Sequence, residues 1–228
     1  MKKTIGIIGG MGPLATCDLM EKIIALTNAK TDQDNIHLVV DCNTNIPDRT
    51  AAILGQGESP VPQLVRSGIK LQSMGADVLI MPCNTAHYFY DSIVQYFDVP
   101  LLHMIKETAN YLKKNNIEKV GLLATNGTVE SQVYDSIMEA KSIEVLIPSE
   151  EDQSAVMEII YQGIKAGKKD FNTVKFSKTM DNLLACGAQK LILGCTELPV
   201  AIELYHMNYP TVDPTEVLAK AAVDYCFH

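Results

Sequence analysis

Short apolar runs alternate along this chain with longer stretches in which apolar and polar residues are mixed. The short runs predict β-strands at residues 4–8, 36–40, 78–81, 99–102, 120–123, 143–147, 190–193 and 210–212. The longer stretches predict helices at residues 14–28, 61–74, 86–96, 105–115, 129–140, 155–166 and 171–185. Strands that alternate with helices form βα units, so the pattern predicts an α/β fold with mainly parallel sheets.

Three segments of the first half recur in the same order in the second half. GADVLIMPCNT (75–85) is echoed by GAQKLILGCTE (187–197), KTIGIIGGMG (3–12) by EKVGLLATNG (118–127), and VPLL (99–102) by YPTV (209–212). We therefore expect two pseudo-symmetric lobes, each with a mainly parallel sheet of about four strands flanked by helices. The predicted N-terminal lobe comprises residues 1–98 plus 208–228, with the last helix crossing back onto it, and the C-terminal lobe comprises residues 99–207.

Composition and charge narrow the possible partners. Of the 228 residues, 47% are hydrophobic, and the formal net charge is −8. Because phosphate binding favours a basic surface, this charge argues against a nucleic-acid partner, although not against a small acidic substrate. No segment approaches the ~20 apolar residues that span a bilayer, and the apolar run near the N-terminus is too short for a secretion signal. We expect a soluble, cytoplasmic protein with no membrane partner.

The six cysteines form no C-x-x-C pair and, with the five histidines, no spacing typical of metal ligands. We therefore expect no metal site and no disulfide framework. Cys17, Cys186 and Cys226 are expected to serve packing. Cys42 follows a predicted strand and is a candidate to line a cleft without reacting.

Cys83 and Cys195 are the candidates for chemistry, because both follow apolar strands at matching positions of the repeat. Ligands of open parallel sheets bind beyond the carboxyl ends of the strands. A helix N-terminus after such a turn is expected to lower a thiol pKa from ~8.5 and to favour the nucleophilic thiolate. The alternative is two inert buried thiols, which is common for free cysteine, but the matched positions favour chemistry.

Polar residues beside these cysteines suggest a carboxylate site. Asn84, Thr85 and Thr196 follow the two cysteines and can donate hydrogen bonds to a carboxylate, or alternatively cap the helices that begin there. Arg49 and Lys165 are the cations of interest, with a solvated surface position as the alternative. His87 lies one helical turn beyond Cys83 and is expected to point away.

The turn GGMGPLA (9–15) contains G-x-G-x-x-A after a strand, and Asp41 ends the second predicted strand. This outline supports a nucleotide-dependent oxidoreductase as one possible class. However, Pro13 lies where backbone N–H groups would bind pyrophosphate, and Asp41 comes later than the usual ~20 residues. The glycines are better explained by close approach of the backbone to a smaller ligand.

Taken together, five stretches resemble the aspartate/glutamate racemase family, and its aspartate branch in particular, along nearly the whole chain. They are IIGGMGP (7–13), NIPDRT (45–50), GADVLIMPCNTAH (75–87), GIKAG (163–167) and LGCTEL (193–198). The resemblance implies a racemase that needs no cofactor, with two lobes, an active site between them, and assembly as a homodimer. It assigns Cys83 and Cys195 as catalytic residues. It also assigns a substrate-binding set, which is Met11, Arg49, Asn84, Thr85, Thr125, Lys165 and Thr196.

Two departures from glutamate racemases favour aspartate as substrate. Those enzymes typically carry Asp-Ser where this chain has Gly10-Met11, and His where it has Glu197. We therefore predict interconversion of L- and D-aspartate, with one cysteine as thiolate base and the other as thiol acid. The alternatives are a glutamate or broad aspartate/glutamate racemase, a non-catalytic dicarboxylate-binding protein, and the oxidoreductase above.

Overall fold

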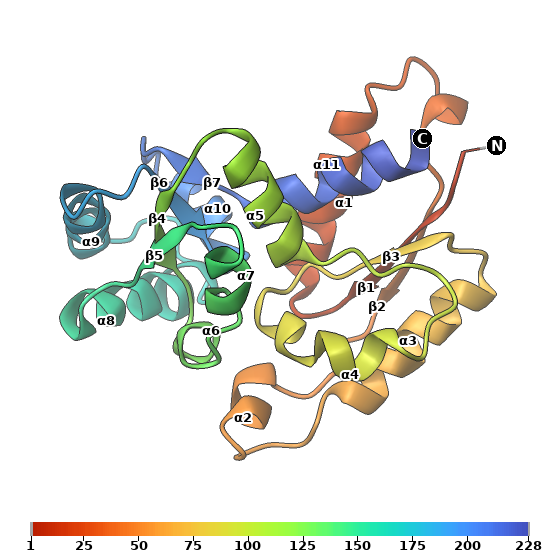
Figure 1. Ribbon diagram of the computed structural model, residues 1–228, viewed down its shortest axis with the longest axis horizontal. Helices are drawn as coiled ribbons and strands as arrows, with labels where there is room; N and C mark the ends of the chain where they lie inside the picture. The colour runs from red at the N-terminus through yellow and green to blue at the C-terminus, as the bar shows by residue number, and fades with distance from the viewer. Residues whose placement is uncertain (1, 228) are drawn as a thin grey trace. The chain divides into compact units, whose positions relative to one another are not determined.

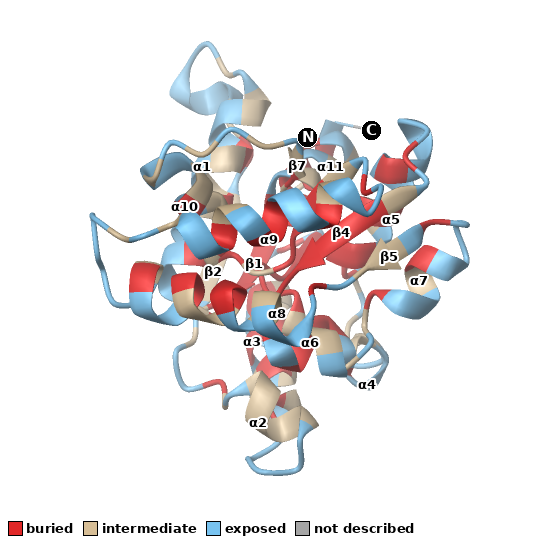
Figure 2. Cartoon of the chain, turned by 90° about the vertical axis from the view of Figure 1, so that its left-hand side faces the viewer, coloured by how far each residue is buried: buried red, intermediate tan, exposed pale blue. Residues whose placement is uncertain are grey.

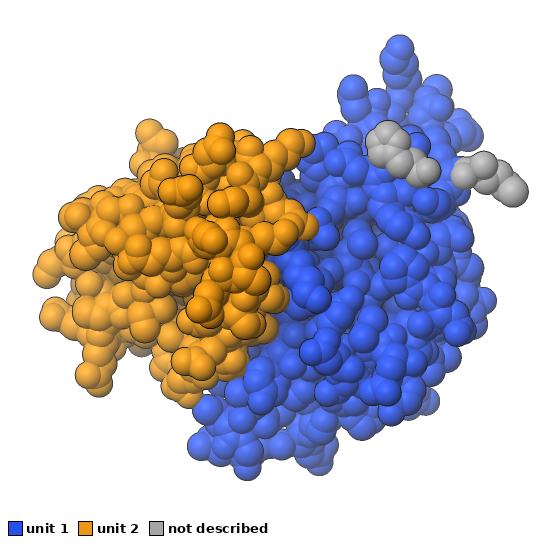
Figure 3. Space-filling model, in the orientation of Figure 1, with its two compact units in different colours: residues 1–107, 215–228 blue, residues 108–214 orange. Residues whose placement is uncertain are grey.

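The computed structural model describes residues 2–227 and divides into two compact units (Figure 3). The first unit comprises Met1–Glu107 with Thr215–His228, and the second comprises Thr108–Pro214. The lobe boundaries drawn from the sequence, near residues 98 and 208, stay a prediction. Each unit carries its own parallel sheet with flanking helices, so the predicted α/β fold with two sheets is confirmed.

The sheet of the first unit has three strands in the order β2-β1-β3 (Figure 1). They are β1 (Ile5–Gly9), β2 (Leu38–Cys42) and β3 (Val78–Ile80), all parallel. The fourth expected strand, at 99–102, is reduced to one parallel bridge between Leu79 and Leu101. The Leu79 N–H donates to the carbonyl of Pro100, and the Leu102 N–H donates to Leu79, so only this short piece of ladder forms.

The sheet of the second unit has four parallel strands in the order β5-β4-β6-β7. They are β4 (Lys119–Leu123), β5 (Glu144–Leu146), β6 (Lys190–Leu193) and β7 (Thr211–Val212). In chain order, β4, β5 and β6 take the positions that β1, β2 and β3 take in the first sheet. The repeated sequence segments therefore fold into the same strand order twice.

Helices follow most strands. In chain order they are α1 (Pro13–Thr27), η1 (Asp32–Asp34), α2 (Arg49–Ile53), α3 (Val61–Ser73), η2 (Thr85–Phe89), α4 (Tyr90–Val94), α5 (Met104–Lys114), α6 (Asn126–Glu130), α7 (Asp135–Glu139), α8 (Glu150–Glu158), η3 (Ile159–Ile164), α9 (Val174–Ala185), α10 (Glu197–Leu204) and α11 (Pro214–Phe227). Within residues 2–227, no helix is long and apolar enough to cross a membrane.

Both faces of the first sheet are covered, which explains why its strands are almost wholly apolar. Ile5 and Ile7 point to one face and pack with residues of α1 and α11, including Leu19 and Leu218. Ile8 points to the other face and joins a cluster formed by α3. The last helix thus packs on the first unit. In the second unit, Figure 2 shows the buried strand β4 in red among partly exposed helices.

Three predicted helices differ from the observed ones. The stretch 86–96 begins as the 3₁₀ helix η2 before α4, and 129–140 splits into α6 and α7 at Gln132, whose φ of 51° ends the helical path. The stretch 155–166 starts earlier, because Ser149 caps α8 by accepting from the Asp152 N–H, and it continues as the π-helix η3. The short helix α2 was not predicted, and α10 was expected only as a helix start after Cys195, without bounds.

Candidate active site

Three predicted site residues of the first unit follow its three strands. Met11 comes after β1, Arg49 begins α2 after β2, and Cys83 comes after β3. Parallel strands end at one edge of the sheet, so all three lie at the edge where α/β proteins bind ligands. Met11 and Cys83 share one buried apolar cluster, and α2 contacts η2, the helix that begins at Thr85.

The Cys83 turn is held by a buried histidine. Nδ1 of His87 lies 2.8 Å from the Cys83 carbonyl oxygen, and the Met104 N–H donates to Nε2 of His87 at 3.1 Å. The expectation that His87 points away is therefore wrong: a 3₁₀ turn brings its ring back to the backbone of Cys83. Burial lowers the pKa of His87 to about 4, so the ring is neutral at pH 7.

Arg49 is partly buried and its guanidinium is anchored to its own loop. Nη1 donates to the carbonyls of Ile46 and Pro47, at 3.3 and 2.9 Å. Nε is buried and has no hydrogen-bond partner within the described part of the chain. Because such a donor is costly to leave unpaired, the free edge of this guanidinium suits a carboxylate oxygen.

Contacts within the chain explain two glycines of the glycine turn, Gly9 and Gly10. A Cβ on Gly10, whose φ is +92°, would lie 2.4 Å from the backbone of Asn43, and one on Gly9 would lie 2.5 Å from Thr16. Thr16 Oγ1 also accepts from the Gly10 N–H at 2.9 Å. Gly9 and Gly10 are thus required by the chain's own packing, whereas a Cβ on Gly12 would meet nothing within 4 Å. The interpretation that the glycines let the backbone approach a smaller ligand stays a prediction.

Three of the predicted carboxylate-binding residues occupy helix N-cap positions. Asn84 precedes η2, Thr125 precedes α6, and Thr196 precedes α10; all are buried, and none caps its helix through its side chain. Thr125 Oγ1 instead lies 3.3 Å from Oγ1 of Thr128, and Thr196 Oγ1 donates to Glu197. Plain N-capping, the alternative explanation for these residues, is therefore not what their side chains do.

Cys195 of the second unit is paired with a carboxylate. Its Sγ lies 3.0 Å from Oε2 of Glu197, and Oε1 of Glu197 lies 3.8 Å from Nζ of Lys165. Burial raises the pKa of the Cys195 thiol well above its ordinary value, and Glu197 raises it further, whereas Lys165 opposes the shift. The expected lowering of this pKa by the helix N-terminus is therefore wrong for Cys195, since desolvation and a neighbouring anion dominate.

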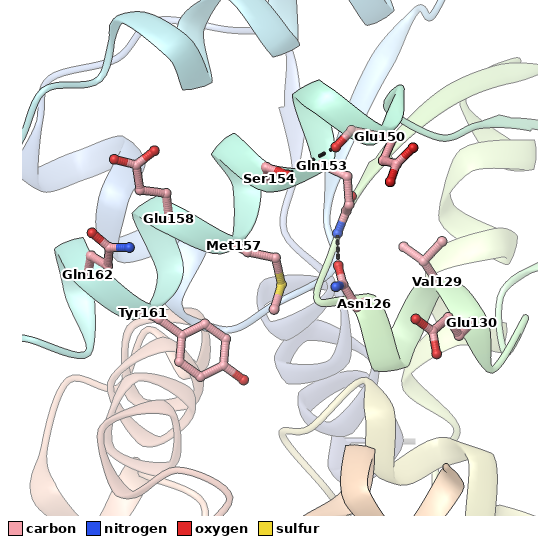
Figure 4. A pocket seen from close by; sticks show the side chains of 10 residues that line it. All are labelled: Asn126, Val129, Glu130, Glu150, Gln153, Ser154, Met157, Glu158, Tyr161 and Gln162. Atoms are coloured by element: carbon pink, nitrogen blue, oxygen red, sulfur yellow. Dashed lines mark hydrogen bonds between the residues drawn. The ribbon is translucent and has the colours of Figure 1, made fainter.

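A hollow of about 740 Å³ lies in the second unit between α6 and α8 (Figure 4). In Figure 4 the Gln153 side chain points across to Asn126, and Nε2 of Gln153 donates to Oδ1 of Asn126 at 2.9 Å. Tyr161 also lines this space, and its ring lies 4.4 Å from Nζ of Lys165. None of the predicted site residues themselves line the hollow.

The remaining cysteines are free thiols. Cys226 is buried, as expected for a packing residue, but Cys17 and Cys186 are exposed, so packing does not explain them. Cys42 is exposed at the end of β2. No group of three or more histidine, cysteine or acidic residues within residues 2–227 has a geometry that would hold a metal ion.

Comparison with known proteins identifies the family. The model for Asp/Glu/hydantoin racemases matches residues 8–222. The structure resembles Picrophilus torridus aspartate racemase with a TM-score of 0.87, at 35% identity over 99% of this chain and 94% of that one. It also resembles an aspartate racemase homologue from Pyrococcus horikoshii OT3 with a TM-score of 0.82, at 25% identity over the full length of both chains.

Another relative is named as a racemase of broad specificity, in contrast to the aspartate racemase above. The chain is 29% identical, over 96% of both proteins, to the broad specificity amino-acid racemase RacX of Bacillus subtilis (strain 168). Similarity over nearly the whole length means that both units of this chain have counterparts in that protein.

Proposed function

Because this chain belongs to the Asp/Glu/hydantoin racemase family, we propose that it interconverts L- and D-aspartate without a cofactor, using Cys83 and Cys195. One observation carries the proposal. Cys83 follows β3 and Cys195 follows β6, and these strands hold the same position in two sheets of the same strand order. A duplicated fold that repeats one thiol per unit suits a reaction needing one proton-transfer group on each face of a carbon.

The proposed reaction moves two protons. A thiolate on one side removes the Cα proton, and a thiol on the other side delivers its proton to the opposite face of the resulting carbanion. The first cysteine ends as a thiol and the second as a thiolate, so the roles are exchanged for the reverse direction. Nothing is oxidised or reduced, and the products are the opposite enantiomer and the same pair of sulfur groups.

The carbanion needs stabilisation, because a Cα–H beside a carboxylate is a very weak acid. Asn84, Thr85, Thr125 and Thr196 are proposed to donate hydrogen bonds to the α-carboxylate, where negative charge builds up. Removing one donor of this kind typically costs about 10²–10³ in rate. The N-cap positions of Asn84, Thr125 and Thr196, which their side chains do not use for capping, support this assignment.

Aspartate is proposed as the substrate because two cations suit a second carboxylate. The unpaired Nε of Arg49 and the ammonium of Lys165 would bind the side-chain carboxylate, with Met11 on the floor of the site. The 35% identity to Picrophilus aspartate racemase favours the same substrate. The 29% identity to RacX favours the alternative, a racemase that accepts several amino acids. We also propose that the enzyme works in the cytoplasm as a homodimer.

The test incubates the purified protein with L-aspartate in deuterated water, without added cofactor. Chiral chromatography is expected to show D-aspartate, and proton NMR is expected to show deuterium at Cα. Cys83→Ser and Cys195→Ser should each lower the rate by at least about 10². The control is Cys17→Ser, which replaces an exposed thiol on α1 and should retain wild-type turnover.

Three results would contradict the proposal in different ways. Near wild-type turnover in either active-site variant would exclude the two-cysteine mechanism. Binding of aspartate without exchange of the α-proton would show a non-catalytic binding protein. Equal racemisation of L-aspartate, L-glutamate and neutral amino acids would show that the enzyme accepts several amino acids and is not specific for aspartate.

A further inference from the structure

Glu197 contacts both the proposed catalytic thiol of Cys195 and the proposed carboxylate-binding ammonium of Lys165. It is the first residue of α10, and its carboxylate turns back toward the preceding residues instead of extending into solvent. Oε2 accepts from Sγ of Cys195 at 3.0 Å and from Oγ1 of Thr196 at 3.3 Å. Oε1 lies 3.8 Å from Nζ of Lys165, and the Glu197 side chain is only 19% exposed.

This geometry fixes the direction of the hydrogen bond to Cys195. An ionised carboxylate can only accept, so the hydrogen of the 3.0 Å contact must lie on sulfur. A thiolate in the same place would lie beside an anion, with an unfavourable charge interaction in a partly buried site. The resting arrangement therefore favours a protonated Cys195.

The surrounding charged groups act on Cys195 in both directions. Lys165, at the end of η3, favours the thiolate, as does the backbone N–H of Glu197, whereas burial and the Glu197 carboxylate favour the thiol. Burial raises the pKa of the Tyr134 hydroxyl, with further contributions from Asp213 and Cys195, so this side chain stays neutral at pH 7. Glu197 is thus the anion in direct contact with this sulfur.

A purely structural role for Glu197 is the alternative. An acidic residue in the first turn of a helix is favourable with the helix dipole, and α10 begins at Glu197. That role requires only a negative charge near the N-terminus. It does not require both carboxylate oxygens to be engaged by the side chains of Cys195, Thr196 and Lys165, as they are here.

We propose that Glu197 is a positioning residue that holds Cys195 as a hydrogen-bond-donating thiol, so that Cys195 begins the cycle as the acid and Cys83 as the base. This inference rests on the two-cysteine racemisation proposed above. In the step that starts from this resting state, the Cα proton passes to Cys83, and the Cys195 proton passes to the carbanion. The new Cys195 thiolate then lies beside Glu197, and Lys165 is the cation that offsets this repulsion.

The test measures the protonation of Cys195 in the free enzyme, without substrate. Chloroacetamide alkylates thiolates, and peptide mass spectrometry reports the rate at Cys195 separately from the other five cysteines. In the wild type the rate should still be rising at pH 9. In Glu197→Gln, the rate at pH 8 should rise roughly three- to tenfold, because the gain in thiolate exceeds the loss of intrinsic nucleophilicity.

Glu203→Gln is the matched control, since it removes the same charge from an exposed position of the same helix. Its alkylation profile should equal that of the wild type, and circular dichroism checks that all variants are folded. A wild-type Cys195 that is fully thiolate at pH 8, or a folded Glu197→Gln with an unchanged profile, would overturn the inference. Because the readout needs no turnover, failure of racemisation alone would overturn only the proposed function.

Discussion

The backbone N–H of Met104 donates a hydrogen bond to Nε2 of His87 at 3.1 Å, while Nδ1 of the same ring faces the carbonyl of Cys83. Nε2 must therefore be unprotonated and Nδ1 must carry the hydrogen, which makes the ring neutral. The ring of His103 lies 4.7 Å away, centroid to centroid. The turn that carries Cys83 is thus fastened to the start of α5 through one neutral imidazole.

This arrangement predicts a specific loss of stability in acid. Burial lowers the pKa of His87 to about 4, and burial, with the nearby His87 and Lys106, lowers that of His103 to about 3. Below about pH 6.5 the two histidines bind protons in the unfolded chain but not in the folded protein. The free energy of unfolding therefore decreases as the pH is lowered, until the pH reaches the pKa values of the folded state. For His87 the full effect is on the order of 3 kcal/mol.

The variant His87→Gln tests this assignment. At pH 7.5 it should unfold at lower urea concentration, because one of the two buried hydrogen bonds is lost, at a cost of about 1–3 kcal/mol. The gap to the wild type should narrow between pH 6.5 and pH 4.5, since the variant lacks the histidine that resists protonation. His37→Gln, at an exposed position, should track the wild type throughout. A constant gap across this range would contradict the assignment.

Gly10 is predicted to tolerate no side chain. Gly10→Ala combines a φ of +92° with a Cβ that would lie 2.4 Å from the Asn43 backbone, so about 2–5 kcal/mol of stability should be lost. Gly55→Ala is the matched control: φ is +69°, but no atom lies within 4 Å, and only about 1–2 kcal/mol should be lost. Thermal unfolding compares the two, and equal shifts would show that backbone strain alone, without the Asn43 contact, sets the requirement.

Arg49 is predicted to select a substrate with a second carboxylate. Arg49→Met should lower kcat/KM for aspartate by roughly 10–100-fold, because a charged hydrogen bond contributes about 1.5–3 kcal/mol. Any activity toward alanine, which lacks that carboxylate, should change far less. Arg66→Met, on the exposed side of α3, should leave both values unchanged. A parallel fall for aspartate and alanine would mean that Arg49 does not contact the side-chain carboxylate.

Local patterns predicted the strands β1–β7 but not the reduction of 99–102 to a single bridge, because mainly apolar runs such as Lys190–Leu193 are typical of strands that are buried on both faces. The repeat also predicted that Cys83 and Cys195 follow equivalent strands. The helix expected at 129–140 failed because Gln132 adopts a positive φ, which its sequence context does not signal. The helix α2 was missed because five residues are too few to show a helical period.

The pattern of apolar and polar residues could not predict which groups each side chain contacts in the folded protein. His87 is fixed by a backbone group 17 positions later, and nothing near it in sequence indicates that contact. Glu197 lies two positions from Cys195, yet only the folded turn shows that its carboxylate faces the thiol. The expected lowering of the Cys195 pKa relied on the helix N-terminus alone, and burial with this anion reverses the sign.

Lys165 is predicted to oppose Glu197 in its effect on Cys195. Lys165 favours the thiolate, so Lys165→Met should slow alkylation of Cys195 at pH 8, the opposite of the change expected for Glu197→Gln. It should also lower kcat/KM for aspartate, since the cation is lost from the carboxylate site. Lys168→Met, three residues along and exposed, should change neither value. Faster alkylation in Lys165→Met would mean that Lys165 acts chiefly by orienting Glu197, because losing the 3.8 Å pair would then release the thiol from its acceptor.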